Sequence, residues 1–246
     1  CATCTAARYC VSQSQTMSTR NSYAAVIAAA GMSSRMGRFK PLLELGGKPM
    51  IRHIADTFRT FGVKKLIVVT GNNAETLEKA LPGDDIEFVR NERYAETQMF
   101  DSAKLGLRRV SSMYENIFFT TADIPLFSAA VLDRLSRTEG DFVCPTFAGS
   151  EGHPVLLRGE AAKRLLADDG DGGMRRAVER QGIRKVCVEV AERGILFDAD
   201  TPADFERIKQ IFRLAKNNAL EPDNRAAGEL EGARPASNWI NRRRKP

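Results

Sequence analysis

The stretch "AAAGMSSRMGRFK", residues 28–40, places small, hydroxylated and cationic residues directly after the apolar run "YAAVI". Gly31 and Gly37 allow backbone conformations in which several amide N–H groups turn toward one point, and such a nest attracts anions. Ser33 and Ser34 add hydroxyl donors. The stretch is therefore either a polar turn or a loop that binds a polyphosphate.

Two cations favour the phosphate-binding interpretation. Arg35 offers a planar fork that matches phosphate oxygens, and Lys40 brings a point charge on a flexible stem. The spacing does not fit the pattern G-x-x-x-x-G-K-[ST], because Arg38 follows Gly37, and it does not fit G-x-G-x-x-G. Neither of these two fingerprints therefore describes the loop.

Asp123 follows the apolar run "IFFTTA" and precedes Ile124-Pro125, so its carboxylate should emerge at the end of a buried strand. Such an aspartate can cap the helix that is expected from Ser128. Nucleotidyl transfer, in contrast, needs a hard cation with oxygen ligands, and Mg²⁺ uses one or two carboxylates. The residues alone leave both roles open.

His153 stands between Gly152 and Pro154, which fix the backbone on both sides of it. This favours a side chain aimed at a ligand, with a loop-shaping role as the alternative. Asp200 precedes Thr201-Pro202, where capping of the following helix is the ordinary role of an aspartate.

Short apolar runs alternate with segments of helical period along the chain. The runs begin at Tyr23, Lys65, Ile86, Asn116, Asp141, Pro154 and Lys185, and the helical segments are Ile51–Phe61, Ala74–Leu81, Met99–Val110, Ser128–Arg137, Glu160–Leu166, Met174–Gln181 and Ala203–Leu214. This alternation predicts a single α/β domain with a doubly wound, mostly parallel sheet flanked by helices. Ligands bind beyond the carboxyl ends of the strands in such sheets.

The length of 246 residues and the hydrophobic content of 43% suit one domain with a core. We expect a disordered leader at 1–21, the domain at 22–215 and a disordered basic tail at 216–246. The net charge is +6, and the tail carries seven basic against four acidic residues. The rest of the chain interleaves both signs, which argues against nucleic-acid binding.

No apolar run reaches the roughly 20 residues that span a bilayer, and residues 1–21 lack the apolar core of a signal peptide. A soluble, cytoplasmic protein without a membrane partner is therefore expected. Cys144 and Cys187 lie inside apolar runs, away from any metal-binding spacing, and should be reduced core residues.

The segment "AAAGMSSRMGRFKPLLELGGKPMI", residues 28–51, resembles the signature of the GT-A-like nucleotidyltransferases, which include the MobA-like enzymes, with Ala28 where leucine is usual. The resemblance extends over roughly residues 23–212. It implies that the loop from Gly31 wraps a nucleoside triphosphate and that Arg35 and Lys40 bind its phosphates as catalytic residues.

Other segments carry the same resemblance. "TADIP" stands where the family has "GDQP" or a similar tetrapeptide, which implies that Asp123 is catalytic and binds Mg²⁺, although Ala122 and Ile124 depart from the pattern. "FDADTPADF" is similar to the "DIDTPED" motif of the molybdenum cofactor cytidylyltransferases, which implies that Asp200 is a second metal ligand.

"VVTGNN" and "NERYAETQMFDSAKLGL" look like the family segments that close over the nucleotide, with Gln98 in place of a glycine. The nucleotide-binding residues implied by the resemblance are Ala29, Ala30, Gly31, Ser33, Ser34, Arg35, Lys40, Gly71, Asn91 and Ser102. "GHPV" and "GDGGMR" resemble the cytidylyltransferases as well, and we assign Gly152, His153 and Asp171 to the acceptor.

These resemblances imply a Mg²⁺-dependent nucleotidyltransferase that moves CMP from CTP to a molybdopterin acceptor, with a molybdoenzyme or its chaperone as a partner. One alternative is a guanylyltransferase or a sugar- or alcohol-phosphate nucleotidyltransferase, and another is a non-catalytic carrier of a nucleotide-containing cofactor. The guanylyl group usually has Gly-Gly where this chain has Ala30-Gly31. Retention of Asp123 and Lys40 favours catalysis over storage.

Overall fold

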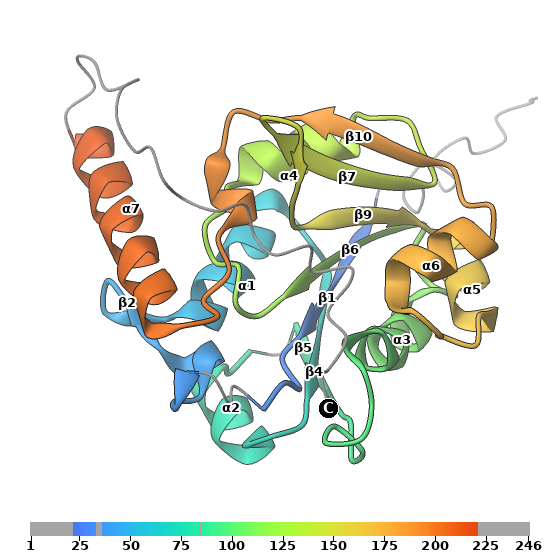
Figure 1. Cartoon of the computed structure of the whole chain (residues 1–246), viewed down its shortest axis with the longest axis horizontal. Helices are drawn as coiled ribbons and strands as arrows, with labels where there is room; N and C mark the ends of the chain where they lie inside the picture. Colours follow the sequence, from blue (N-terminus) through green and yellow to red (C-terminus); the bar gives the residue numbers. More distant parts are fainter. Residues whose placement is uncertain (1–21, 33–35, 84, 221–246) are drawn as a thin grey trace, which may run out of the picture.

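The computed structural model describes residues 22–32, 36–83 and 85–220 (Figure 1). Its strands are β1 (Tyr23–Ala28), β2 (Glu44–Leu45), β3 (Lys48–Pro49), β4 (Lys65–Thr70), β5 (Ile86–Arg90), β6 (Asn116–Thr121), β7 (Phe142–Phe147), β8 (Ser150–Glu151), β9 (Val155–Arg158) and β10 (Lys185–Glu189). Its α-helices are α1 (Met50–Phe61), α2 (Ala74–Ala80), α3 (Met99–Val110), α4 (Ala129–Ser136), α5 (Gly159–Ala167), α6 (Gly173–Arg180) and α7 (Pro202–Leu220), with short 3-10 helices η2 (Lys40–Leu42) and η3 (Arg193–Leu196).

The main sheet has eight strands within these described ranges, in the order β10-β7-β9-β6-β1-β4-β5, with β8 paired to β7. β1 runs parallel to β4 and β6, β4 to β5, and β7 to β10, whereas β9 is antiparallel to both of its neighbours. The expected doubly wound, mostly parallel sheet is thus confirmed. The carboxyl ends of β5, β4, β1, β6 and β7 all meet at one edge.

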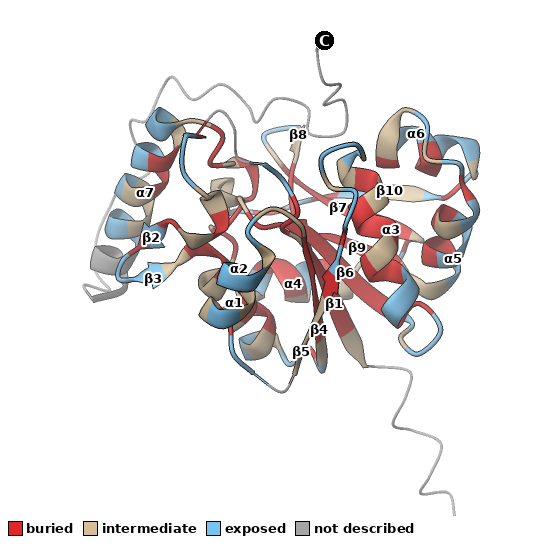
Figure 2. Ribbon diagram, turned by 90° about the horizontal axis from the view of Figure 1, so that it is seen from below, coloured by how far each residue is buried: buried red, intermediate tan, exposed pale blue. Residues whose placement is uncertain are grey.

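Helices cover both faces of the sheet because its strands are apolar on both sides. Ala24 and Val26 of β1 pack with α3, α5 and α6, whereas Ala25 and Ile27, one residue out of step, pack with α1 and α4. Figure 2 shows the buried strands between these two helical layers. Because successive side chains of a strand point to opposite faces, their alternation determines which helical layer each residue packs against.

α7 packs away from the two main faces, against the β2–β3 hairpin (Figures 1 and 2). Leu45 of the hairpin and Phe205 of α7 share a third apolar cluster. His53 of α1 donates from Nε2 to the Leu45 carbonyl oxygen at 2.6 Å, and its ring lies 5.1 Å from that of Phe212. α7 extends to Leu220.

Along the described residues, no helix is long and apolar enough to cross a membrane.

Candidate functional site

Lys40, Asp123 and Asp200, far apart in the sequence, meet at the carboxyl edge of the sheet. Lys40 Nζ lies 2.7 Å from Asp200 Oδ1 and 3.5 Å from Asp123 Oδ2. The side chains of Lys40, Asp123 and Asp200 are exposed by 12%, 18% and 8%. They are thus shielded enough for strong electrostatic interaction and still accessible to a small ion or a phosphate oxygen.

The backbone explains why the two carboxylates meet. Ala122 N donates to Ala28 O at 3.0 Å, which carries the β1–β6 pairing up to the residue before Asp123. Ala199 N then donates to Asp123 O at 3.0 Å. Asp123 and Asp200 are therefore held side by side by main-chain hydrogen bonds on either side of the site.

The glycine-containing loop begins directly after β1. Gly31 is exposed, and Gly37 has a φ of 64°, in the left-handed region that favours glycine. Ser33, Ser34 and Arg35, which we expect to bind phosphate, lie outside the described residues.

Ala29 and Ala30, which are expected to bind the nucleotide, have buried side chains. They are only 3% and 5% exposed and belong to the two core clusters on opposite faces of the sheet. Their chain position continues the alternation of β1, which turns each methyl group inward. Only their backbone is therefore suited to contact a nucleotide.

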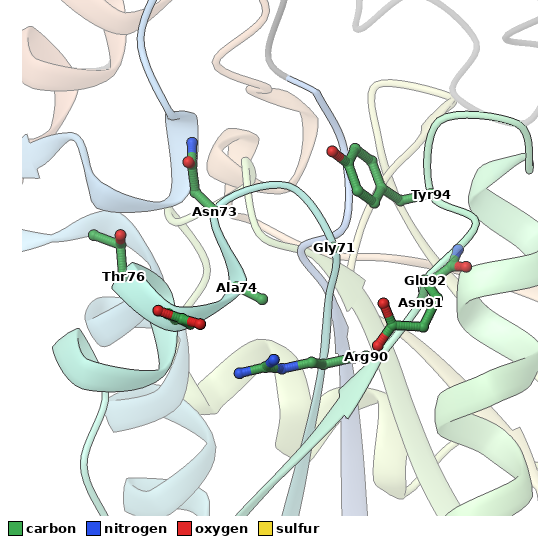
Figure 3. A pocket seen from close by; sticks show the side chains of 9 residues that line it. Gly71, Asn73, Ala74, Thr76, Arg90, Asn91, Glu92 and Tyr94 are labelled. Atoms are coloured by element: carbon green, nitrogen blue, oxygen red, sulfur yellow. The ribbon is translucent and has the colours of Figure 1, made fainter.

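A cavity of about 360 Å³ opens beside this loop (Figure 3). Its lining comes from the start of α2 and from the segment after β5: Gly71, Asn73, Ala74, Glu75, Thr76, Arg90, Asn91, Glu92 and Tyr94. A Cβ atom on Gly71 would lie 2.7 Å from Tyr94 Cβ and 2.9 Å from Ala30 O. Gly71 is thus required for the close approach of three loops that follow strands.

Tyr94 lies in the segment "NERYAETQMFDSAKLGL", which carries the family resemblance, but the resemblance itself assigns this residue no role. An aromatic side chain in a polar connection after a strand is the signal that identifies it, because stacking surfaces for a base are aromatic.

Asn91 and Ser102, both expected to bind the nucleotide, are 5% exposed and bonded to each other. Asn91 Nδ2 donates to Ser102 Oγ at 2.9 Å and to Thr97 Oγ1 at 2.8 Å, and Asn91 Oδ1 accepts from Arg93 N at 3.1 Å. Asn91 also lines the cavity, whereas Ser102 does not. Ser102 therefore braces the connection between β5 and α3 from within.

The backbone of Gly152 and His153 contacts η3 at Ile195. His153 N donates to Ile195 O at 3.0 Å, and a Cβ atom on Gly152 would lie 2.5 Å from that oxygen. The His153 side chain has no exposed surface, and its ring lies 5.8 Å from that of Phe119. This burial favours the loop-shaping alternative for His153 over direct contact with an acceptor.

Asp171 is exposed in the loop before α6, and its carbonyl oxygen accepts from Arg180 Nη1 at 2.7 Å. The neighbouring Asp168 is buried, and it accepts from Arg180 Nε at 3.1 Å and from Gly170 N at 2.8 Å. The Arg180 guanidinium, followed by the Gly170 amide and Gln181, outweighs burial and holds the pKa of Asp168 well below its usual range. The loop is thus anchored by Asp168 and presents Asp171 to solvent.

Throughout the described ranges, no set of three or more His, Cys, Asp or Glu side chains gathers closely enough to hold a metal ion alone. Asp123 and Asp200 form a pair of hard oxygen donors with the Lys40 ammonium between them. The position of this ammonium shows that the two carboxylates face a shared cation position. Mg²⁺ retains waters and substrate phosphates as further ligands, so a two-carboxylate site fits this ion.

The comparisons with known proteins agree with this fold. Residues 25–186 match the model of the MobA-like NTP transferase domain. This chain therefore belongs to the MobA-like NTP transferase domain family.

Individual relatives extend the comparison. The chain is 28% identical over 189 residues to the molybdenum cofactor cytidylyltransferase of Escherichia coli K12, covering 76% of this chain and 95% of that protein. It is 28% identical over 231 residues to the bifunctional protein GlmU of Paraburkholderia phytofirmans, covering 87% of this chain but 47% of that protein. The chain thus spans about half the length of this relative, or less in others of the same name.

A solved nucleotidyl transferase structure from Methanothermobacter has a TM-score of 0.69 and 27% identity to this chain, and the alignment covers 79% of this chain and 99% of that one.

Proposed function

We propose that this chain is a Mg²⁺-dependent nucleotidyltransferase that transfers CMP from CTP to a molybdopterin-type acceptor and releases pyrophosphate. The observation that carries the proposal is the contact of Lys40 with Asp123 and Asp200 at the carboxyl edge of the sheet, beside a glycine-containing loop. Family membership and the similarity to a molybdenum cofactor cytidylyltransferase support it.

In the proposed reaction, a terminal phosphate oxygen of the acceptor attacks the α-phosphorus of the nucleotide. The bond from this phosphorus to the bridging oxygen breaks, and pyrophosphate leaves. No protein nucleophile is needed, so the protein acts by positioning and by stabilising the charge of the transition state.

Asp123 and Asp200 would hold Mg²⁺, which supplies charge neutralisation at the phosphates when it is bound. Lys40 is placed to exchange its carboxylate partners for phosphate oxygens, because its ammonium already lies at the site on a flexible stem. Arg35 would contribute a second cation from the loop after β1.

The cavity between α2 and the segment after β5 would receive the base and ribose. Tyr94 offers a ring for stacking, and Asn91 presents a polar edge that Thr97 and Ser102 hold in place. The shape of this cavity, set by Gly71 and Tyr94, is therefore the expected determinant of the base.

A nucleotide panel tests this proposal. The protein is incubated with Mg²⁺, a molybdopterin acceptor and each nucleoside triphosphate in turn, and pyrophosphate is measured. We expect kcat/KM for CTP to exceed that for GTP at least about tenfold, which corresponds to about 1.4 kcal/mol. Equal values, or a preference for GTP, would remove the cytidylyl assignment and leave nucleotidyl transfer in place.

Ala30→Gly is a useful second variant in this panel. Because Ala30 packs in the core cluster beside α3, the change removes a buried methyl group and loosens the wall behind Gly71. We expect the ratio of kcat/KM for CTP to that for GTP to decrease, and the variant to be less thermally stable than the wild type.

A further inference from the structure

Cys144 of β7 and Cys187 of β10 are direct partners across two parallel strands. Cys144 is fully buried, as the sequence predicts, but the prediction of a core position for Cys187 is wrong because it is exposed. The reason is topological: among the strands of the described residues, β10 is the last at its end of the sheet and pairs with β7 alone. A buried thiol therefore lies beside a thiol that solvent reaches.

The surroundings of the two thiols differ. Cys144 Sγ lies 3.7 Å from Gly152 O and 3.6 Å from Pro145 O. Cys187 Sγ lies 3.9 Å from Glu151 Oε1, and this carboxylate is itself paired with Lys185, two residues before Cys187 and on the same face of β10.

A hydrogen bond from Cys144 to the Cys187 sulfur is the largest influence on the pKa of both thiols. This hydrogen bond and then burial raise the pKa of Cys144 well above its ordinary value. The same hydrogen bond, together with the charge of Lys185, lowers the pKa of Cys187 to about 7. Cys187 is thus the better nucleophile of the pair, and Cys144 keeps its proton.

We propose that Cys187 and Cys144 form an oxidant-sensitive pair that closes into a reversible disulfide between β10 and β7. The spacing allows it, since neighbouring strands lie roughly 4.7–4.9 Å apart and disulfides join Cα atoms about 4.4–6.8 Å apart. The exposed position of Cys187 gives the oxidant access, and the register places Cys144 as the resolving thiol.

A hydroperoxide serves as the two-electron oxidant that converts the two thiols into a disulfide. The Cys187 thiolate attacks one peroxide oxygen, the O–O bond breaks, and a sulfenic acid forms with release of water or an alcohol. Cys144 sulfur then attacks the Cys187 sulfur, the S–S bond forms, and the sulfenic oxygen leaves as water with the Cys144 proton. A dithiol reductant restores both thiols by exchange.

The experiment uses the full chain with three residues outside the described ranges replaced by serine in every sample: Cys1, Cys4 and Cys10. The protein is titrated with hydrogen peroxide, free thiols are blocked with N-ethylmaleimide, and intact mass and peptides are analysed. We expect loss of both free thiols together and a peptide that links Cys144 to Cys187, reversed by dithiothreitol.

Two variants separate the roles of the thiols. Cys187→Ser, at an exposed position, should keep its melting temperature and leave Cys144 unoxidised at the same dose. Cys144→Ala should leave Cys187 as a sulfenic acid that dimedone traps. The proposal is overturned if peroxide modifies Cys187 without any linked peptide in the parent protein, or if Cys144 is oxidised as readily in the Cys187→Ser variant.

Discussion

Lys40 Nζ lies 2.7 Å from Asp200 Oδ1, although 160 residues separate the two in the sequence. This contact joins the loop after β1 to the segment before α7. Because Asp123 lies on the other side of the same ammonium, the positive charge stands where two carboxylates converge. The Lys40 ammonium thus contacts both carboxylates.

Replacing Lys40 by methionine tests this relationship without nucleotide. Removing a positive charge within 4 Å of two carboxylates should raise their affinity for a divalent cation about fivefold, or about 1 kcal/mol. Mn²⁺ binding, followed by electron paramagnetic resonance, measures this affinity directly. The same variant should bind CTP more weakly, because it lacks a phosphate partner. Unchanged Mn²⁺ affinity in Lys40→Met would show that the ammonium does not hold the cation position.

Asp123→Asn should lower kcat/KM for pyrophosphate release by about 100-fold or more, since one anchored electrostatic partner is worth about 3 kcal/mol in a transition state. The melting temperature should change little, because Lys40 keeps Asp200 as its partner. Circular dichroism melts accompany the kinetics, and Asp133→Asn on the exposed face of α4 serves as the matched control.

Arg35→Ala should weaken triphosphate binding or slow transfer, since the change removes a charge-assisted contact to phosphate. The apo protein should keep its thermal stability. Isothermal titration with a non-hydrolysable CTP analogue measures the affinity, and normal binding together with normal turnover would refute the phosphate role of this arginine.

Ser102→Ala tests the bracing role that the structure assigns to this residue. The Asn91 amide loses one of its two acceptors in a buried position, which should cost about 1 kcal/mol and lower the melting temperature by a few degrees. KM for CTP should rise more than kcat falls, because Asn91 lines the cavity. A kcat decrease with constant KM would assign Ser102 to the chemical step instead.

Asp168→Asn gives a pH-dependent stability difference. The folded pKa of Asp168 is lowered, so its charge stabilises the fold above the unfolded pKa of about 3.9 and this contribution is lost as the pH falls toward the folded pKa. The free energy of unfolding of the wild type should exceed that of the variant by about 2 kcal/mol near pH 6, and this difference should decrease below pH 4. Urea unfolding at several pH values measures it, and a constant gap would contradict the assignment.

The local sequence predicts the features that depend on residues close together in the chain. The apolar runs and helical periods located the strands and helices, and the resemblance of residues 28–51 identified the family. The sequence does not encode locally that Asp123 and Asp200 converge on Lys40, because this depends on main-chain hydrogen bonds between distant segments.

Burial was the harder property to predict. The family resemblance implies a nucleotide contact for Ser102, and Gly152 and Pro154 favour a ligand contact for His153, yet both side chains are buried. In each case a hydrogen bond to another segment fixes the position. His153 N donates to Ile195 O in η3, and Asn91 Nδ2 donates to Ser102 Oγ. The opposite error occurs at Cys187. Its apolar run predicts a buried position, but the run forms the end strand of the described sheet, and Cys187 is exposed.

The most direct measurement follows the α-phosphorus. CTP labelled with ³²P at the α position is incubated with Mg²⁺, a molybdopterin acceptor and either the wild type or Asp123→Asn. The proposed function predicts that the wild type transfers the label to the acceptor in step with pyrophosphate release, and that transfer falls at least about 100-fold in the variant. Bound CTP without label in the acceptor would identify a carrier, and equal transfer by Asp123→Asn would contradict the role of this site.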